Sequence, residues 1–391
     1  MTGLKMSFTE IIAKYDNFDF NSWCEKITEQ KVKNILSANH LSELDFLALL
    51  SPAAAGYLEE MAVKARELTL KRFGCTVIIF TPLYISNYCC NTCPYCSFAG
   101  QHRIKRRHLS IDEVRTEAEA IADLGIRHIL LLTGESREMA SIEYLEAAVN
   151  VLRGKFSSIG IEVYPLTEQE YGRVIDAGVD GLTIYQETYN IPRYKELHKR
   201  GPKSDYEFRL LAPERACRQG IRQVTVGALL GLYDWCSEAF FTGLHAAYLQ
   251  KQFPSVEVSV SFPRLRPLAG EFEVKYPVDD RRFVQIMTAT RIFLNSAGIT
   301  LSTRESREFR NAVLPLGVTK MSAGTSTAVG GHTENPSTTQ FEIADSRGVE
   351  QMRRDLQRMG YQAVMHDWNR RYLEVELPRK NGHVTKQFSS V

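Results

Sequence analysis

The chain has 391 residues, of which 44% are hydrophobic and 24% charged, and its formal net charge is +2 at neutral pH. Such a composition is typical of a globular protein with one large α/β domain and appendages, or two smaller domains. A nearly neutral chain has no field that attracts nucleic acid or an anionic membrane, so we expect small molecules and proteins as partners. The first residues lack an apolar signal segment and no run approaches membrane-spanning length, which predicts no membrane association and a cytoplasmic location.

The first 74 residues are predicted to be helical, because apolar residues recur at helical spacing over 25–52 and 53–74. From there the pattern changes to short, β-branched runs, each followed by an amphipathic segment. We predict eight strands, at 76–84, 127–135, 161–166, 180–187, 223–232, 256–265, 299–305 and 319–325. The helices between them include 111–124, 205–219, 237–250 and 279–295, and Ser110–Glu113 and Thr167–Glu170 are capping boxes at helix starts.

Eight strands that alternate with helices predict an α/β fold of the (β/α)8 type, with an open doubly wound sheet as the alternative. The barrel is favoured because the unusual polar residues follow the carboxyl ends of strands, where barrel enzymes place their active sites. We expect a helical extension over 1–74, the barrel over 75–325, and a C-terminal appendage over 326–391 with a helix near 347–359 and a final strand. The Gly-, Thr- and Ser-rich loop after residue 325 is either a lid or a connector.

Three cysteines after the first strand, Cys89, Cys93 and Cys96, have the spacing CxxxCxxC. Three thiolates in one loop can hold an iron–sulfur cluster and leave a fourth iron open for another ligand. A zinc site that also uses Cys90 is the alternative, but adjacent side chains diverge in an extended backbone and a second CxxC is absent. A redox CxxC pair would not need the third thiol. We therefore interpret Cys90 as a packing residue.

This loop, with Tyr95 before its last cysteine, resembles that of radical S-adenosylmethionine enzymes. The resemblance implies two cofactors, a [4Fe–4S] cluster and S-adenosylmethionine, whose amino and carboxylate groups chelate the open iron. Reductive cleavage then gives a 5′-deoxyadenosyl radical. Residues 132–135, Leu-Thr-Gly-Glu, resemble the family segment that binds the methionyl ammonium, which implies that role for Glu135.

A closer resemblance is to the aromatic amino acid lyases of this superfamily, and among them to the tyrosine lyases that supply the thiazole ring of thiamine. It rests on runs such as RIKRR, IYQETY, GALLGL, SVSFPRLRP, LSTRES and the late Asp367-Trp368. From about residue 255 onward the chain resembles the biotin and thiamin synthesis associated region. The resemblance implies cleavage of the Cα–Cβ bond of tyrosine to 2-iminoacetate (dehydroglycine) and p-cresol. Thiazole synthase is the implied consumer of 2-iminoacetate.

Several arginines are candidates for the carboxylates of substrate and cofactor. Arg304 matches the family's substrate-carboxylate arginine and Ser322 its hydroxyl partner, with an ion pair to Glu305 or Glu308 as the alternative for Arg304. Arg209 matches a position that reaches the cofactor carboxylate in related enzymes.

Arg264 and Arg266 alternate along one predicted strand and therefore face the same side. We expect Arg264 to bind substrate, with Gln186, Glu187 and the carboxylates of cofactor and substrate as partners of the two arginines. Gln186, Glu187 and Tyr95 are also expected to take part in cofactor binding, together with Glu135 and Arg209. A structural layer of ion pairs is an equally good interpretation.

The run 102–108, HRIKRRH, is a dense positive segment beside the cysteine loop. It is either a solvated face or a docking surface, at Lys105, Arg106 and Arg107, for an acidic flavodoxin or ferredoxin that reduces the cluster. Candidate proton acceptors are Tyr185, Tyr189, His198 and His332.

Three other functions are alternatives to the cleavage of tyrosine for thiamine synthesis. A tyrosine lyase of hydrogenase maturation carries a second cluster near its C-terminus, but the last cysteine here is Cys236. A tryptophan lyase shares several of the motifs more loosely. A non-catalytic iron–sulfur or zinc module is the alternative from a different class.

Overall fold

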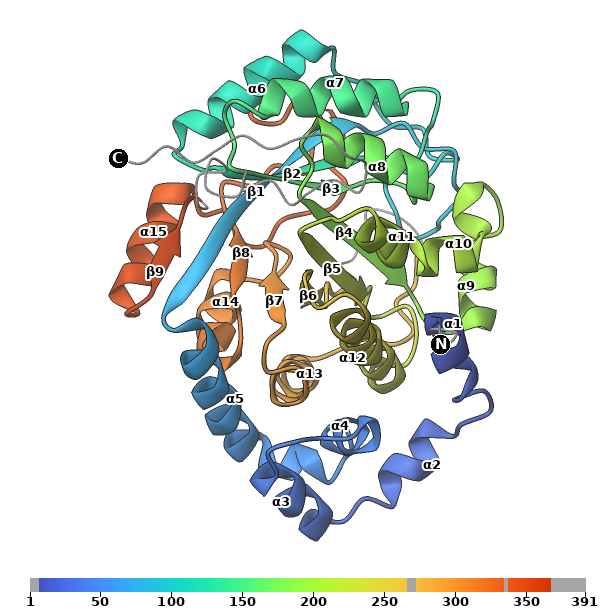
Figure 1. Cartoon of the computed structure of the whole chain (residues 1–391), viewed down its shortest axis with the longest axis vertical. Helices are drawn as coiled ribbons and strands as arrows, with labels where there is room; N and C mark the ends of the chain where they lie inside the picture. Colours follow the sequence, from blue (N-terminus) through green and yellow to red (C-terminus); the bar gives the residue numbers. More distant parts are fainter. Residues whose placement is uncertain (1–6, 266–271, 334–336, 367–391) are drawn as a thin grey trace, which may run out of the picture.

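Eight parallel strands close into a barrel in the computed structural model, which describes residues 7–265, 272–333 and 337–366 (Figure 1). The strands are β1 (Thr76–Ser86), β2 (His128–Thr133), β3 (Ser158–Glu162), β4 (Gly181–Glu187), β5 (Gln223–Ala228), β6 (Glu257–Ser261), β7 (Gly298–Leu301) and β8 (Lys320–Ser322). Each strand pairs with the next, and β1 pairs with both β8 and β2, which closes the ring. The predicted (β/α)8 fold is confirmed. Closure places all eight carboxyl ends at one mouth.

Strand positions follow the apolar runs, with the largest difference at β3. The predicted run 161–166 begins three residues after the strand does, because Ser158 already pairs with His128 of β2. The apolar residues after Glu162 continue as a loop, and Pro165 within it has no N–H to donate to a neighbouring strand. Tyr164 instead donates a hydrogen bond to the carbonyl of Ala140. Glu162 therefore lies at the carboxyl end of its strand.

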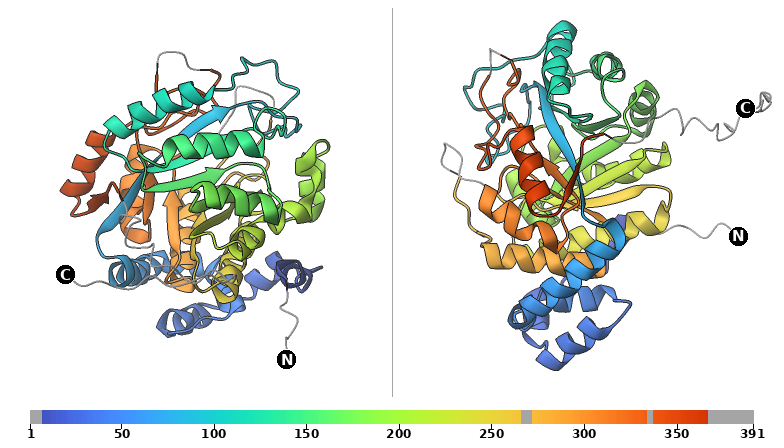
Figure 2. Two further views of the ribbon diagram at one scale, coloured as in Figure 1. Left: turned by 45° about the horizontal axis from the view of Figure 1, so that its top comes forward. Right: turned by 90° about the vertical axis from the view of Figure 1, so that its left-hand side faces the viewer.

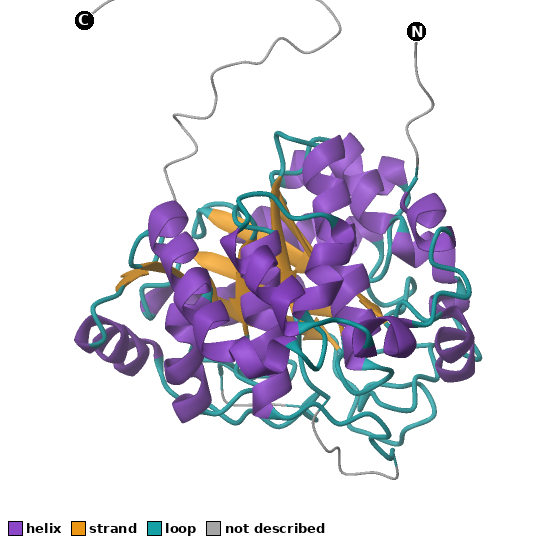
Figure 3. Ribbon diagram, turned by 90° about the horizontal axis from the view of Figure 1, so that it is seen from below, coloured by secondary structure: helices purple, strands orange, loops and turns teal. Residues whose placement is uncertain are grey.

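The helices surround the strands, as Figures 2 and 3 show. Those that connect consecutive strands are α6 (Ile111–Asp123), α7 (Ile142–Leu152), α8 (Glu168–Ala177), α9 (Ile191–Leu197), α10 (Tyr206–Leu210), α11 (Ala212–Arg218), α12 (Trp235–Gln252), α13 (Asp280–Phe293) and α14 (Arg307–Val313). Both predicted capping boxes are present, with Ser110 and Thr167 accepting backbone hydrogen bonds from Glu113 and Glu170. The predicted helix 205–219 is divided at Leu211, because Pro213 begins a new helix there.

The N-terminal helices cover the barrel from the side of α12 and α13 (Figure 1). They are α1 (Phe8–Ala13), α2 (Phe20–Glu25), α3 (Glu29–Ser37), α4 (Glu43–Leu49) and α5 (Leu58–Phe73). Phe46 of α4 stacks on Phe293 of α13 with ring centroids 4.5 Å apart. Phe8 of α1 stacks on His245 of α12 at 4.0 Å. Burial of these aromatic rings fixes the extension to the barrel.

The C-terminal part adds helix α15 (Val349–Arg358) and strand β9 (Gln362–Val364). Strand β9 pairs with the first residues of β1, from Thr76 to Ile78, and lies beside the barrel. The motif residues Asp367 and Trp368 lie outside the described residues. Within the described ranges no single helix is long and apolar enough to cross a membrane, although the bent pair Glu43–Leu49 and Ala54–Phe73 passes by length and composition.

A substitution at Gly243 of α12 tests the contact between the extension and the barrel. A Cβ atom at this position would meet the ring of Phe46 at 2.3 Å, and Phe46 is fully buried. We expect Gly243→Ala to lower the free energy of unfolding by about 1–3 kcal/mol, because overpacking exceeds the gain in helix propensity. Denaturant unfolding measures the change. Gly56→Ala is the control, since nothing lies within 4 Å of its Cβ position; equal effects of the two substitutions would contradict the close contact.

Candidate active site

The cysteine loop between β1 and α6 is held in place from within by one arginine. The guanidinium of Arg106 donates hydrogen bonds to the carbonyls of Asn87, Phe98, Ala99 and His102, at 2.5 to 3.3 Å. The amide of Cys96 donates to the carbonyl of Cys93, which forms a tight turn between these two cysteines. Arg106 is thus a structural residue of the loop. The structure therefore assigns it this role instead of the predicted role in docking an electron carrier.

The four cysteines of the loop differ in their surroundings. Cys93 is buried, Cys89 and Cys96 are half-buried, and all are free thiols. Burial raises the pKa of the Cys93 thiol to about 12, against the opposing charge of Lys203, and burial also raises the pKa of Cys96. Cys90 is exposed, and its thiol donates a hydrogen bond to the carbonyl of Glu135. The interpretation of Cys90 as a packing residue is therefore wrong, because its side chain is exposed.

Asn91 links the cysteine loop to two other segments. Its side-chain amide donates to the carboxylate of Glu135 at 2.6 Å and to the sulfur of Cys89 at 3.8 Å. Its carbonyl oxygen accepts a hydrogen bond from the amide of Lys203 at 3.0 Å. The backbone amide of Cys90 also donates to the carbonyl of Glu135, at 2.9 Å. Asn91 thus positions Glu135, which follows β2, beside the first cysteine.

Tyr95 lies behind the cysteines and is fixed by a neutral histidine. Its hydroxyl lies 2.7 Å from Nε2 of His198, and Nδ1 of His198 lies 2.8 Å from the carbonyl of Tyr194. Burial lowers the pKa of His198 to about 3, so the imidazole is neutral and donates from Nδ1 to the carbonyl. The Tyr95 hydroxyl therefore donates to Nε2. His198, which was a candidate proton acceptor, thus positions Tyr95.

Glu187 ends β4 in a left-handed backbone conformation, with φ of 71°. Its carboxylate pairs with Lys203 at 2.5 Å and with Arg209 at 3.3 Å. Burial alone would raise the pKa of Glu187, but these two cations hold it below its usual range. Two cations around one carboxylate leave an excess positive charge beside the cysteine loop, which suits an anionic group of a ligand.

The structure differs from two expectations for this strand. Glu187 is a partner of Lys203 and Arg209 rather than of Arg264. Gln186 alternates with Tyr185 and Glu187, so its side chain faces away from the barrel interior and donates to the carbonyl of Tyr206 at 3.4 Å. Its predicted role in cofactor binding is therefore replaced by a contact with α10.

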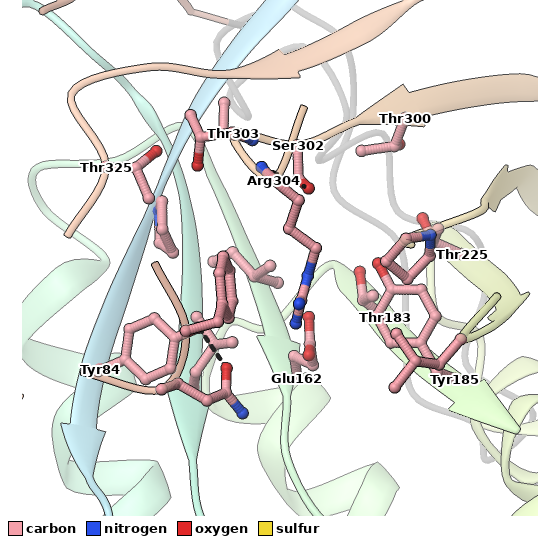
Figure 4. A pocket seen from close by; sticks show the side chains of 18 of the residues that line it. Tyr84, Glu162, Thr183, Tyr185, Thr225, Thr300, Ser302, Thr303, Arg304 and Thr325 are labelled. Carbon is pink, nitrogen blue, oxygen red and sulfur yellow. Dashed lines mark hydrogen bonds between the residues drawn. The ribbon is translucent and has the colours of Figure 1, made fainter. Parts of the chain in front are cut away.

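A cavity opens at the carboxyl ends of the strands, and Cys96 and Tyr95 form part of its wall. Arg304, in the turn after β7, extends into this cavity toward Glu162 of β3 (Figure 4). Its guanidinium stacks on the ring of Phe341, 3.5 Å from the centroid. Among the described residues the guanidinium makes no hydrogen bond and no ion pair within 4.0 Å, and burial lowers the pKa of Arg304. An arginine remains charged in proteins, so Arg304 is a half-buried cation in the cavity wall, ready for an anionic ligand.

Hydroxyl groups surround Arg304 in the cavity. Ser322, at the end of β8, accepts a hydrogen bond from the backbone amide of Thr303 at 3.1 Å. The side-chain hydroxyls of Thr300, Thr303 and Thr325 are buried without a hydrogen-bond partner in the described part of the chain. All four residues line the cavity. Unpaired buried hydroxyls are costly unless a ligand completes their hydrogen bonds.

The loop after β8 covers this part of the cavity. Gln340 accepts a hydrogen bond from the hydroxyl of Tyr84 at 2.7 Å, and Phe341 lies against Arg304. The amide of Ala344 donates to the carbonyl of Thr303 at 2.8 Å. The residues that follow the Gly-, Thr- and Ser-rich run thus pack against the cavity.

Arg264 does not reach the cavity wall. Its guanidinium pairs with Glu305 and with Asp280 of α13, the latter at 2.7 Å, and lies against the rings of Phe283 and Phe309. These contacts place Arg264 in the structural layer that was the alternative interpretation, and its predicted role in substrate binding is replaced by this one. Since Glu305 is occupied by Arg264, it does not pair with Arg304. Arg266 lies outside the described residues.

Sequence reasoning missed three residues near the site: Asn91, Lys203 and Glu162. Asn91 and Lys203 carry no signal, because their contacts join segments far apart in the chain. A signal existed for Glu162, since it interrupts the apolar run Ile161-Glu162-Val163 of a buried strand. Of the four candidate proton acceptors, Tyr185 lines the cavity. Tyr189 packs on Phe8 and His245 instead, and His332 lies against the carbonyl of Pro82.

Comparison with known proteins identifies the family. The family description "Radical SAM superfamily" matches residues 83–237, and "Biotin and Thiamin Synthesis associated domain" matches residues 261–362. The chain is 41% identical over 344 residues to 2-iminoacetate synthase of Escherichia coli (strain K12), covering 88% of this chain and 91% of that protein. This chain belongs to the 2-iminoacetate synthase family. The family predicted from the sequence is thereby confirmed, and the chain is a radical SAM enzyme.

Solved structures share the fold of this chain. The FeFe-hydrogenase maturase HydG from Carboxydothermus hydrogenoformans has a TM-score of 0.81 and 32% sequence identity, over 92% of this chain and 82% of that chain. Methylornithine synthase (PylB) has a TM-score of 0.69 at 19% identity over 85% of this chain and 97% of that chain, which shows the shared fold.

Membership of the radical SAM superfamily implies S-adenosylmethionine and a [4Fe–4S] cluster as cofactors. Within the described ranges, no three His, Cys, Asp or Glu side chains converge closely enough to share one metal ion. A [4Fe–4S] cluster does not require that convergence, because each thiolate binds a different iron. Three free thiols in one anchored loop, with an amide directed at Cys89, fit this group.

Alanine substitutions separate the four cysteines of the loop. We expect Cys90→Ala to retain the cluster, because its thiol only meets a backbone carbonyl. Cys89→Ala, Cys93→Ala and Cys96→Ala should each lose it, since two thiolates do not hold a four-iron cluster with an open position. Iron and sulfide content after anaerobic reconstitution measures the result. Cys90 is the matched control, and loss of iron from Cys90→Ala alone would reassign the ligands.

Proposed function

We propose that this chain cleaves the Cα–Cβ bond of L-tyrosine to 2-iminoacetate and p-cresol, for the thiazole ring of thiamine. The observation that carries the proposal is Arg304, a half-buried cation that pairs with no anion of the described chain and faces a cavity whose wall includes Cys96. An α-carboxylate is the anion that such a site suits. The name of the Escherichia coli relative, 2-iminoacetate synthase, supports the product.

Cys89, Cys93 and Cys96 would hold the cluster, which together with S-adenosylmethionine supplies a 5′-deoxyadenosyl radical when both are bound. Glu135 is aligned by Asn91 at 2.6 Å and would accept the methionyl ammonium. Arg209 and Lys203 would bind the methionyl carboxylate, because Glu187 neutralises only one of their two positive charges. Tyr95, fixed by His198, closes this side of the cavity.

The substrate would lie across the barrel mouth. Arg304 would hold the tyrosine carboxylate, and Ser322 and Thr303 would complete its hydrogen bonds. A carboxylate fixed in this way presents the amino group in one orientation, which contributes to catalysis by proximity. The loop residues Gln340 and Phe341 cover the carboxylate end and exclude water from the reacting atoms.

Arginine substitutions test this function in an anaerobic assay with S-adenosylmethionine, reductant and tyrosine. We expect p-cresol from the wild type. Arg304→Lys should lower kcat/KM for tyrosine by about 10- to 100-fold, because lysine loses the two-pronged contact with a carboxylate. Arg264→Lys is the matched control, which should lower thermal stability but leave KM for tyrosine unchanged, since Arg264 pairs with Glu305 and Asp280. Neither p-cresol nor 5′-deoxyadenosine from the wild type would overturn the proposal.

A tryptophan lyase would share the same carboxylate site. Turnover of tryptophan without turnover of tyrosine in this assay would establish that alternative. A hydrogenase-maturation activity would instead release cyanide and carbon monoxide, and a protein that binds one zinc ion and does not cleave S-adenosylmethionine would be a non-catalytic module.

The proposed partners are thiazole synthase, which would consume 2-iminoacetate, and an acidic flavodoxin or ferredoxin, all in the cytoplasm. Two cations of the segment 102–108 are exposed, Arg103 and Lys105. Arg107 is occupied by Glu113 at 2.8 Å, and Arg106 by the loop carbonyls. The docking surface that the structure supports is therefore Arg103 and Lys105 beside the cysteine loop.

Charge reversal tests this surface. Arg103→Glu with Lys105→Glu should slow reduction by flavodoxin about tenfold at low ionic strength, because electrostatic steering is lost, and leave reduction by dithionite unchanged. Stopped-flow absorbance of the cluster measures both rates. Lys71→Glu with Arg72→Glu is the control, since both residues are exposed at the end of α5, before the amino end of β1. Equal rates for the two double variants would remove the surface from the proposal.

A further inference from the structure

Glu162 is the one carboxylate in the cavity wall that no cation of the described chain holds. It is the last residue of β3 and pairs in register with Leu132 of β2, and both side chains line the cavity. The other carboxylate of the wall, Glu187, is held by Lys203 and Arg209. The carboxylate of Glu162 makes no hydrogen bond and no ion pair within 4.0 Å in the described part of the chain. Glu162 is half-buried, and a carboxylate in a cavity wall with no partner in the described chain favours a role with a ligand.

Arg304 and Glu162 extend toward each other from opposite sides of the barrel mouth (Figure 4). Their nitrogen and oxygen atoms are more than 4.0 Å apart, so the two side chains form no direct ion pair, and both line the cavity. An α-amino acid carries a carboxylate and an ammonium on one carbon atom, and this pair of charges is complementary to it. The unpaired hydroxyl of Thr303 lies on the Arg304 side, which gives the ligand a direction: carboxylate at Arg304 and ammonium at Glu162.

We propose that Glu162 is a catalytic residue that binds the substrate ammonium and removes one proton from it. This inference rests on the proposed function. In the transfer the N–H bond breaks, its electron pair remains on nitrogen as a lone pair, and an O–H bond forms on Glu162. Loss of a hydrogen atom from nitrogen to the adenosyl radical requires this neutral amine, because an ammonium has no lone pair to stabilise the resulting radical.

The surroundings of Glu162 suit a proton acceptor. Burial and the carboxylate of Glu187 raise its pKa to about 7, against the opposing charges of Arg304, Arg209 and Lys203. The hydroxyls of Tyr84 and Tyr185 complete the set of titratable groups around it. A base with a pKa near the working pH is both ionised and able to take a proton. Below this pKa the carboxyl is protonated and cannot accept the ammonium proton, so activity should fall on the acidic side.

Binding of two ligands distinguishes a Glu162 that binds the ammonium from a Glu162 that only supports the structure. Tyrosine has both charged groups, whereas 3-(4-hydroxyphenyl)propanoate has the carboxylate and the phenol without the amine. With the cluster and S-adenosylmethionine bound, we expect Glu162→Gln to weaken tyrosine binding by about tenfold or more and to leave binding of the analogue unchanged. Titration calorimetry measures both. Equal losses for the two ligands would show that Glu162 only supports Arg304 and would overturn the proposal.

Turnover tests the proton transfer. We expect Glu162→Gln to lower the rate of p-cresol formation by roughly 100-fold and to abolish the decline of kcat/KM below about pH 7, with release of 5′-deoxyadenosine in the absence of tyrosine unchanged. Glu162→Asp should retain the acidic decline at a reduced rate. Glu168→Gln is the matched control, since Glu168 is the first residue of α8 and pairs at the surface with Arg218 at 3.5 Å.

The outcomes distinguish this inference from the proposed function. A Glu162→Gln enzyme with wild-type rate and wild-type pH profile would overturn the proton transfer while the cleavage of tyrosine stands. A wild type that forms no p-cresol would count against the proposed function alone, because the binding comparison with the two ligands requires no turnover.

Discussion

Closure of the eight parallel strands is the constraint on which the site depends. Strand β1 pairs with β8 through Ile78, Ile79 and Phe80, and with β2 from Thr81 onward, so one strand closes the ring at both of its edges. Its carboxyl end then delivers the cysteine loop to the mouth of the barrel. Because all strands are parallel, Glu162, Glu187 and Arg304 reach the same mouth from three different strand ends. No one segment of the chain contains the site, and the closed sheet assembles it.

Apolar periodicity was sufficient to predict the barrel, and local spacing was sufficient to predict the cysteine loop. Both signals are contained within a few consecutive residues, and the eight strands follow the eight apolar runs. The roles of the charged residues were harder to predict, because an ion pair depends on which segments meet in space. Arg264 and Arg304 look alike in the sequence, yet Arg264 pairs with Glu305 and Asp280, whereas Arg304 pairs with no anion of the described residues. The same pairing rules out Glu305 as the ion-pair partner of Arg304, which was one of the alternatives.

Strand register explains the remaining differences. Side chains alternate along β4, so Tyr185 and Glu187 face the interior and Gln186 faces α10. Adjacent polar residues that are equally good candidates for ligand binding therefore have different surroundings. The start of β3 at Ser158 places Glu162 at the strand end, a position that the apolar run 161–166 concealed. Asn91 and Lys203 could not be found from local patterns, since their hydrogen bond spans 112 positions of the chain. These residues become visible only when the loops at the mouth are brought together.

The charges at the mouth fall into two groups with different consequences. Around Glu187, two cations share one anion, so the region beside the cysteines keeps an excess positive charge and favours a ligand carboxylate. Across the cavity, Arg304 and Glu162 remain apart, and neither charged group has an ion-pair partner in the described chain. A direct ion pair between them would be the simpler way to stabilise the fold. Their separation instead fits an α-amino acid, whose own two charges satisfy both residues at once. The free protein lacks the stabilisation that an ion pair would give these two residues. Substrate binding supplies it, and only a ligand that has both an ammonium and a carboxylate can satisfy both residues.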